Sequence, residues 1–183
     1  MNVLILNGNP DAGNGDFDRY IQSLAKGLTG KRHTVQTHIL REMDIRYCIG
    51  CWNCWFKTPG ICRYDDAMPA IYKSVVASSL VIFASPIIMG FVSSLLKRAN
   101  ERLIPLLHPY VDLVNGESHH RGRYKHYPDW GLVLQKGSDA DDEDIHIISD
   151  IYRRETLNFR ASLRFTFLTD QPVREVCDAI DAL

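Results

Sequence analysis

Four of the five cysteines fall in one short segment, and they carry the most distinctive chemistry of the chain. Cys48, Cys51, Cys54 and Cys62 follow the pattern C-x2-C-x2-C-x7-C. Thiolates spaced in this way can converge on one tetrahedral zinc ion or on a cubane iron-sulfur cluster. The fifth cysteine, Cys177, falls on the apolar side of a helical pattern, which favours a role as a small buried hydrophobic group.

Two charged stretches could also contact a ligand. Residues 119–127 (HHRGRYKHY) belong to a basic and aromatic loop predicted at 116–128. Its cationic donors suit an anionic dinucleotide phosphate or an acidic substrate, although a solvated loop or a subunit contact would have the same composition. Residues 139–144 (DADDED) are acidic, and we expect them to begin a helix, where carboxylates favour the dipole. Metal binding by these carboxylates is the alternative.

Composition places the chain among single-domain globular proteins. It has 183 residues, 45% hydrophobic and 23% charged, with a formal net charge of -1. This near-neutral balance provides no global field to attract nucleic acid or an anionic membrane, and no apolar run reaches the roughly 18 residues that span a bilayer. The opening residues lack the basic start of a signal peptide, so we expect a cytoplasmic protein whose cysteines are reduced.

Hydrophobic periodicity predicts an α/β protein. Continuous or alternating apolar segments predict strands at residues 3–6, 35–39, 80–84, 132–134 and 163–167. Amphipathic stripes predict helices at residues 17–28, 68–76, 92–103, 148–152 and 176–183. This alternation predicts a flavodoxin-like three-layer fold in one domain, residues 1–183, with a five-stranded parallel sheet in the order 2-1-3-4-5. Ligands of such sheets bind where the first and third strands diverge, here at the loops 8–16 and 86–90.

The motifs LILNGNP, CIGCWNCW with PGIC, DDAMPAIY, and VIFASPIIMG leading into FVSSLLKRANERLIPLL cover roughly residues 1–107. Together they resemble the flavodoxin-fold NAD(P)H-dependent FMN reductases, especially the iron-sulfur flavoprotein branch. The resemblance implies bound FMN, reduction by NAD(P)H, and a homodimer or homotetramer. It also implies that Cys48, Cys51, Cys54 and Cys62 ligate a [4Fe-4S] cluster, while other flavodoxin-like reductases keep such a segment as free thiols.

The resemblance places the FMN-binding residues in three loops. Main-chain N–H groups and a helix N-terminus are expected to hold the phosphate, and the loop 86–90 is expected to meet the flavin ring. The residues implied are Asn9, Pro10, Asn14, Gly15 and Asp16 at the phosphate, Pro86, Ile87, Ile88, Met89 and Gly90 at the ring, and Lys136 and Gly137 after the fourth strand.

The predicted phosphate loop departs from the family pattern in its charge. Asp11 stands where relatives carry an arginine, and Asp16 stands where they carry a hydroxyl. A carboxylate about 6 Å from one phosphate charge repels it by roughly 3 kcal/mol at an effective dielectric of about 20. In one interpretation Asp16 is the N-cap of a helix that begins at Phe17 and occupies the amides. In the other, FMN binds through Asn9, Asn14 and main-chain donors, with Asp11 turned to water.

We therefore expect an FMN-dependent NAD(P)H oxidoreductase that passes electrons to a quinone, a nitroaromatic compound or free flavin. No catalytic side chain is expected, because N5 of the flavin performs the hydride chemistry. The first alternative is an iron-sulfur flavoprotein that transfers single electrons. The second is a non-catalytic binding or thiol-sensing module that has lost FMN.

Overall fold

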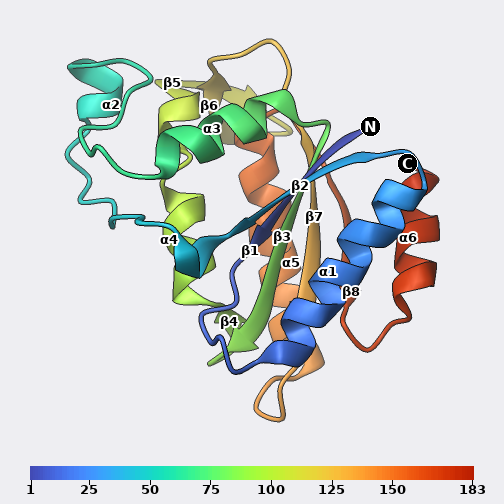
Figure 1. Cartoon of the computed structure of the whole chain (residues 1–183). Coiled ribbons are helices and arrows are strands. Elements are labelled where there is room, and N and C mark those ends of the chain that lie inside the picture. The colour runs from blue at the N-terminus through green and yellow to red at the C-terminus, as the bar shows by residue number, and fades with distance from the viewer.

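A parallel five-stranded sheet with the order β2-β1-β3-β7-β8 forms the centre of the computed structural model, which describes residues 1–183 (Figure 1). Its strands are β1 (Asn2–Asn7), β2 (Thr34–Ile39), β3 (Leu80–Ile88), β7 (Asp129–Gln135) and β8 (Leu163–Leu168). The order of these main strands is 2-1-3-4-5, which confirms the predicted flavodoxin-like fold.

Helices cover both faces of the sheet (Figure 1). One layer contains α1 (Gly15–Gly30) and α6 (Val173–Asp181), and the other contains α3 (Met68–Ala77), α4 (Ser94–Glu101) and α5 (Asp142–Asn158). Successive residues of a strand point to opposite faces, so Val3 and Ile5 pack with α1 and α6, whereas Leu4 and Leu6 pack with the other three helices. No helix has the length and apolar character required to cross a bilayer.

The prediction of a loop at 116–128 is wrong over its first half, because residues there form the strand β6 (Glu117–Gly122). This strand pairs antiparallel with β5 (Leu107–Val114) in a hairpin. Asn115 and Gly116 both have positive φ, 52° and 83°, as a two-residue hairpin turn requires. The turn signal was present in the sequence, but the polar composition of the second strand concealed its pairing. His119 is consequently buried in this strand and does not lie in a solvated loop.

The predicted helix 92–103 also needs correction, because the chain first forms a short strand, β4 (Phe91–Val92). This strand pairs antiparallel with the end of β3 around a turn at Met89 and Gly90. Helix α4 then starts behind Ser93, whose Oγ accepts a hydrogen bond from Leu96 N. Residues 86–88 are therefore the end of β3, and Met89 and Gly90 form the turn of a β-hairpin and not a strand-to-helix loop.

The acidic stretch 139–144 begins a helix as predicted. Asp141 is the N-cap of α5, and its side chain accepts from Asp144 N while the side chain of Asp144 accepts from Asp141 N. This reciprocal pair satisfies two otherwise unbonded amides. The remaining short elements are α2 (Asn53–Phe56) within the cysteine segment and the 3-10 turns η1 (Leu40–Glu42) and η2 (Ile104–Leu106).

Candidate functional site

The two predicted ligand loops meet at the carboxyl edge of the sheet, near the lower end of Figure 1. Gly8 N donates to Ala84 O at 2.7 Å, which joins the end of β1 to β3. A Cβ added to Gly8 would lie 2.5 Å from Leu96 Cβ, so only glycine allows α4 to approach this closely. Ser93 Oγ also donates to Gly8 O. The N-terminal end of α4 thus fixes the distance between the two loops, and the region at the strand edge between residues 8–16 and 86–90 is called the crevice below.

The hairpin tip provides an apolar surface on one side of this crevice. Pro86 and Ile87 are buried within β3, whereas Ile88 is 42% exposed and Met89 is 91% exposed. Gly90 has φ +75°, and a Cβ at this position would collide with a carboxylate of α5. Of the five residues predicted to meet a flavin ring, Ile88 and Met89 therefore present side chains that a planar ligand could cover, while Pro86 and Ile87 serve the sheet.

The N-cap of α1 is Asn14, and the interpretation that gave this role to Asp16 is wrong. Asn14 Oδ1 accepts from Phe17 N at 3.4 Å, and helix α1 starts at Gly15. Asp16 is exposed and pairs with Arg19. Asn14 Nδ2 also donates to Gln135 Oε1 at 2.7 Å, which ties the loop to the end of β7.

Main-chain donors of the predicted phosphate loop are bonded within the loop itself. Asn7 Oδ1 accepts from Asn9 N at 2.9 Å, and Asn9 Oδ1 accepts from Asp11 N at 3.1 Å. The Asp11 carboxylate accepts from Gly13 N at 2.7 Å, and the carbonyl of Asp11 accepts from Asn14 N at 3.1 Å. Asn9 is fully buried in this network, whereas Pro10 is exposed. These acceptors occupy amides that the resemblance assigned to a phosphate.

A half-buried carboxylate anchors the base of the loop. Asp18 accepts from Asn7 Nδ2 at 2.8 Å and from Asn9 Nδ2 at 3.2 Å, and its second oxygen lies 2.9 Å from Arg41 Nη2. Burial opposes ionisation of Asp18, but the hydrogen bonds from Asn7, Asn9 and Arg41 outweigh it and hold the pKa of this carboxyl below its ordinary value. The Arg41 guanidinium is therefore already paired.

Lys136 is engaged in a similar pair, since its Nζ lies 2.7 Å from Asp142 Oδ1. Gly137 is exposed beside it. The two halves of the crevice thus differ in how they suit FMN. The hairpin side offers open apolar surface for a flavin ring. The loop 8–16 does not fit a phosphate as it stands, because its own oxygens bond the amides of Asn9, Asp11, Gly13 and Asn14.

The four clustered cysteines line a second site, a cavity of about 60 Å³ beside the C-terminal end of α4. Cys48 and Cys51 are exposed, Cys54 is buried, and Cys62 is intermediate; none forms a disulfide. Burial, followed by the proximity of the other three thiols, raises the pKa of Cys54. The donor set suits a metal or a cluster, yet no three side chains of metal-binding type are grouped around one centre. The thiols would have to move closer together to ligate one.

A buried ion pair closes the segment that contains these cysteines. Arg102 Nη1 lies 2.8 Å from Asp66 Oδ2, and the two side chains are 1% and 0% exposed. Arg102 also donates to Arg46 O at 2.6 Å and to Cys62 Sγ at 3.4 Å. Asp66 in turn accepts from Arg46 N at 3.1 Å. The pair therefore joins both ends of residues 46–66 to α4.

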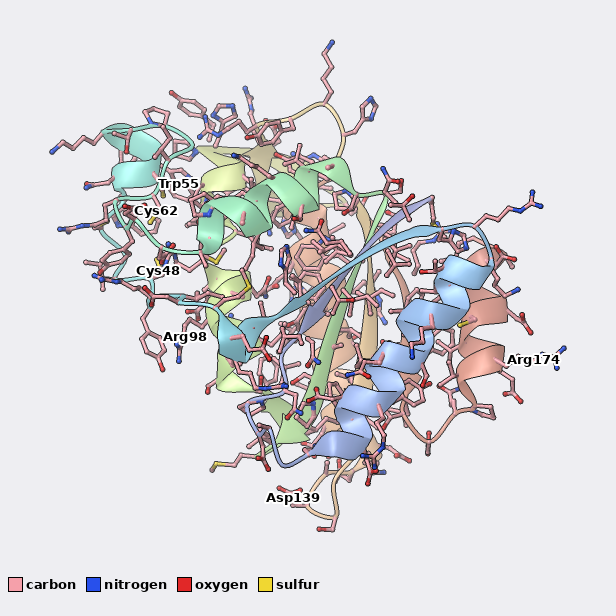
Figure 2. All side chains as sticks on the ribbon, in the orientation of Figure 1. Cys48, Trp55, Cys62, Arg98, Asp139 and Arg174 are labelled. Carbon is pink, nitrogen blue, oxygen red and sulfur yellow. The ribbon has the colours of Figure 1, made fainter.

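Aromatic stacking connects the cysteine segment to β6. Trp52 stacks on Trp55 with ring centroids 4.9 Å apart, and Trp55 meets His120 at 4.7 Å. Figure 2 shows Cys48, Trp55 and Cys62 grouped at one end of the molecule, with the loop that carries Asp139 at the opposite end. The cavity and the crevice are thus separate sites within one chain.

The sequence model of the NADPH-dependent FMN reductase family matches residues 1–124. The chain belongs to this family. An iron-sulfur flavoprotein of Archaeoglobus fulgidus is 29% identical over 94 residues, which cover 51% of this chain and 42% of that protein. An iron-sulfur flavoprotein of Clostridioides difficile is 30% identical over 104 residues, 56% of this chain and 45% of that protein. The matches thus span less than half of either relative's length.

Solved structures with the same fold include two that are described as quinone reductases. A putative quinone reductase from Klebsiella pneumoniae superposes with a TM-score of 0.67 at 13% identity, over 100% of this chain and 83% of that one. An NAD(P)H:quinone oxidoreductase from Methanothermobacter marburgensis superposes with a TM-score of 0.63 at 14% identity, over 99% of this chain and 90% of that one. At such identities the likeness shows the fold alone.

Proposed function

We propose that the protein is a flavin-dependent oxidoreductase that takes electrons from NADH or NADPH and passes them to a small acceptor. The acceptor would be a quinone, a nitroaromatic compound or free flavin. The observation that carries this proposal is the exposed hairpin tip of Ile88 and Met89 beside the loop after β1, at the strand edge where flavodoxin-like sheets bind ligands. Membership of the FMN reductase family supports it.

The chain's own residues would bind and orient the ring. Ile88 and Met89 would cover one face of it, and the turn at Gly90 would let the backbone approach its polar edge. When bound, a flavin would supply the redox chemistry, which is the transfer of a hydride from the nicotinamide and of electrons to the acceptor.

The test is an assay of flavin-dependent oxidation of NADH and NADPH with a quinone present. The loss of nicotinamide absorbance measures this oxidation. Met89→Asp should weaken flavin binding at least about 10-fold, because it places a charge against the apolar ring. Leu113→Asp is the matched control, since Leu113 is exposed on β5, away from the crevice. Nicotinamide oxidation that does not depend on added or bound flavin would contradict the proposal.

A second candidate is an iron-sulfur flavoprotein for one-electron transfer, favoured by the cavity that all four clustered cysteines share. Cys48, Cys51, Cys54 and Cys62 would ligate the cluster, and Arg102 would donate to the sulfur of Cys62. A bound cluster supplies single-electron steps, with a potential that depends on such hydrogen bonds.

Iron and sulfide analysis of anaerobically purified protein tests this candidate. Cys51→Ser should remove iron and leave flavin binding intact. Cys177→Ser is the control, because Cys177 is buried on α6 against α1 and should not affect iron content. Equal iron in the parent protein and in Cys51→Ser would reject cluster ligation by this segment.

A further inference from the structure

We infer that the crevice selects an unphosphorylated flavin, such as riboflavin, over FMN, and that Asp11 sets this preference. The inference rests on the proposed function, because it concerns the identity of the flavin that the same site binds. It differs from what family membership alone would suggest, namely a phosphate held by the loop after β1.

The first supporting observation is that Asp11 already acts as the anion of the loop. Its Oδ1 lies 2.7 Å from Gly13 N, a distance typical of a charge-assisted hydrogen bond. A Cβ added to Gly13 would lie 3.0 Å from the same oxygen, so the carboxylate is folded directly over the glycine turn. An incoming phosphate would have to displace this carboxylate and would then remain beside its negative charge.

The second observation concerns the cations around the loop, which are each neutralised by a carboxylate. Arg19 pairs with Asp16 in the first turn of α1. Arg41 lies 2.9 Å from Asp18, and Lys136, after β7, pairs with an acidic residue of α5. A phosphate would therefore find each of these three cations already beside a carboxylate, whereas the Asp11 carboxylate has no cationic partner.

A neutral ribityl chain avoids both difficulties. Its hydroxyl groups carry no charge for Asp11 to repel. They can donate to loop carbonyls and can accept from the side-chain amide of Asn14, which already reaches Gln135. The apolar tip of Ile88 and Met89 is available to either flavin, since it contacts the ring and not the chain end.

The expected discrimination follows from Coulomb's law. At about 6 Å and an effective dielectric of about 20, the repulsion between Asp11 and one phosphate charge corresponds to an affinity roughly 100-fold lower. Asp11 is exposed, so salt screens part of this effect. We expect removal of the Asp11 charge to raise FMN affinity at least about 10-fold at low ionic strength, and by a smaller factor in high salt.

The experiment is a pair of equilibrium titrations of the protein, one with riboflavin and one with FMN. Quenching of the flavin fluorescence measures binding in each titration. The parent protein should bind riboflavin more tightly than FMN. Asp11→Asn should tighten FMN binding at least about 10-fold and leave riboflavin affinity within a factor of about two. Asp139→Asn is the control, because it removes the same charge from an exposed loop at the same end of the sheet (Figure 2) without touching the loop 8–16.

Each outcome decides between the alternatives. A parent protein that binds FMN more tightly than riboflavin would overturn the inference, as would Asp11→Asn with an unchanged ratio of FMN to riboflavin affinity. An equal gain in FMN affinity from Asp139→Asn would show a general effect of net charge. Asp11 would then not be the residue that sets the flavin preference. Failure of every variant to bind either flavin would refute the proposed function itself. Because Asp11 is exposed, its substitution should leave the fold intact, which circular dichroism checks.

Discussion

Replacing Asp66 with asparagine should destabilise the protein strongly, because it leaves the buried Arg102 guanidinium without its counter-charge. Two oxygens of Asp66 accept from Arg102, at 2.8 and 3.2 Å, and both side chains are shielded from water. Nε of Arg102 already has no partner. The pair also joins Arg46 and Cys62 to α4, so the substitution should loosen the whole segment 46–66.

Removing one partner of a buried ion pair typically costs about 3–5 kcal/mol, whereas an exposed pair contributes about 0–1 kcal/mol. We therefore expect the free energy of unfolding to fall by about 3–5 kcal/mol in Asp66→Asn. Urea denaturation followed by far-UV circular dichroism measures it. Asp150→Asn is the matched control, because Asp150 pairs with Arg153 and His146 on the exposed surface of α5.

A pH series provides a second measurement on the same variant. Burial opposes ionisation of Asp66, but hydrogen bonds from Arg102, Arg46 N and Met68 N outweigh it and hold its pKa below the ordinary value. Stability from this carboxylate is thus present above an unfolded pKa of about 3.9 and is lost as pH falls through the lower folded pKa. The difference in the free energy of unfolding between the parent protein and Asp66→Asn should become smaller below about pH 4. If Asp66→Asn lost no more unfolding free energy at neutral pH than Asp150→Asn, the reasoning would be refuted.

Two further expectations follow from packing and exposure. Gly8→Ala should lower stability by about 1–3 kcal/mol, because its methyl would lie 2.5 Å from Leu96 Cβ and 3.1 Å from Ala84 O; an unchanged thermal midpoint would show that α4 can move away at no cost. Cys51 is exposed and should react with an alkylating reagent in the native protein, whereas Cys177 is 3% exposed and should react only after unfolding. Peptide mass spectrometry measures both rates, and equal rates would contradict the packing of α6 on α1.

The main sheet could be predicted because burial on both faces leaves a direct trace in the sequence. β1 is a continuous apolar run that ends in polar residues at the carboxyl edge. β3 begins as such a run at Leu80–Ala84, but it continues through Ser85 and Pro86 to Ile88, beyond the predicted strand end. The hairpin of β5 and β6 has no such trace, since one face of it is exposed and the strand from Glu117 to Gly122 is almost wholly polar. Only the Asn115-Gly116 turn indicated it.

The candidate sites were less predictable, because they depend on choices that residue types alone leave open. Asparagine and aspartate are equally good N-caps, so the sequence could not distinguish Asn14 from Asp16. In the structure Asn14 is the N-cap, so helix α1 begins two residues earlier than a cap at Asp16 would place it. The pairing of Asp66 with Arg102 joins positions 36 apart in the sequence, and its only local trace is an acidic residue after the last clustered cysteine.

Helix α4 relates the two candidate sites to each other. Ser93 at its start bonds to Gly8 O in the crevice, and Arg102 just beyond its end lines the cysteine cavity. Its eight residues span about 12 Å at 1.5 Å per residue, so the sites do not share contacts. Each end of α4 is fixed by its own hydrogen bonds. Loss of iron from the cavity should therefore leave flavin affinity unchanged, which makes a flavin-only reductase and an iron-sulfur flavoprotein distinguishable in the same protein.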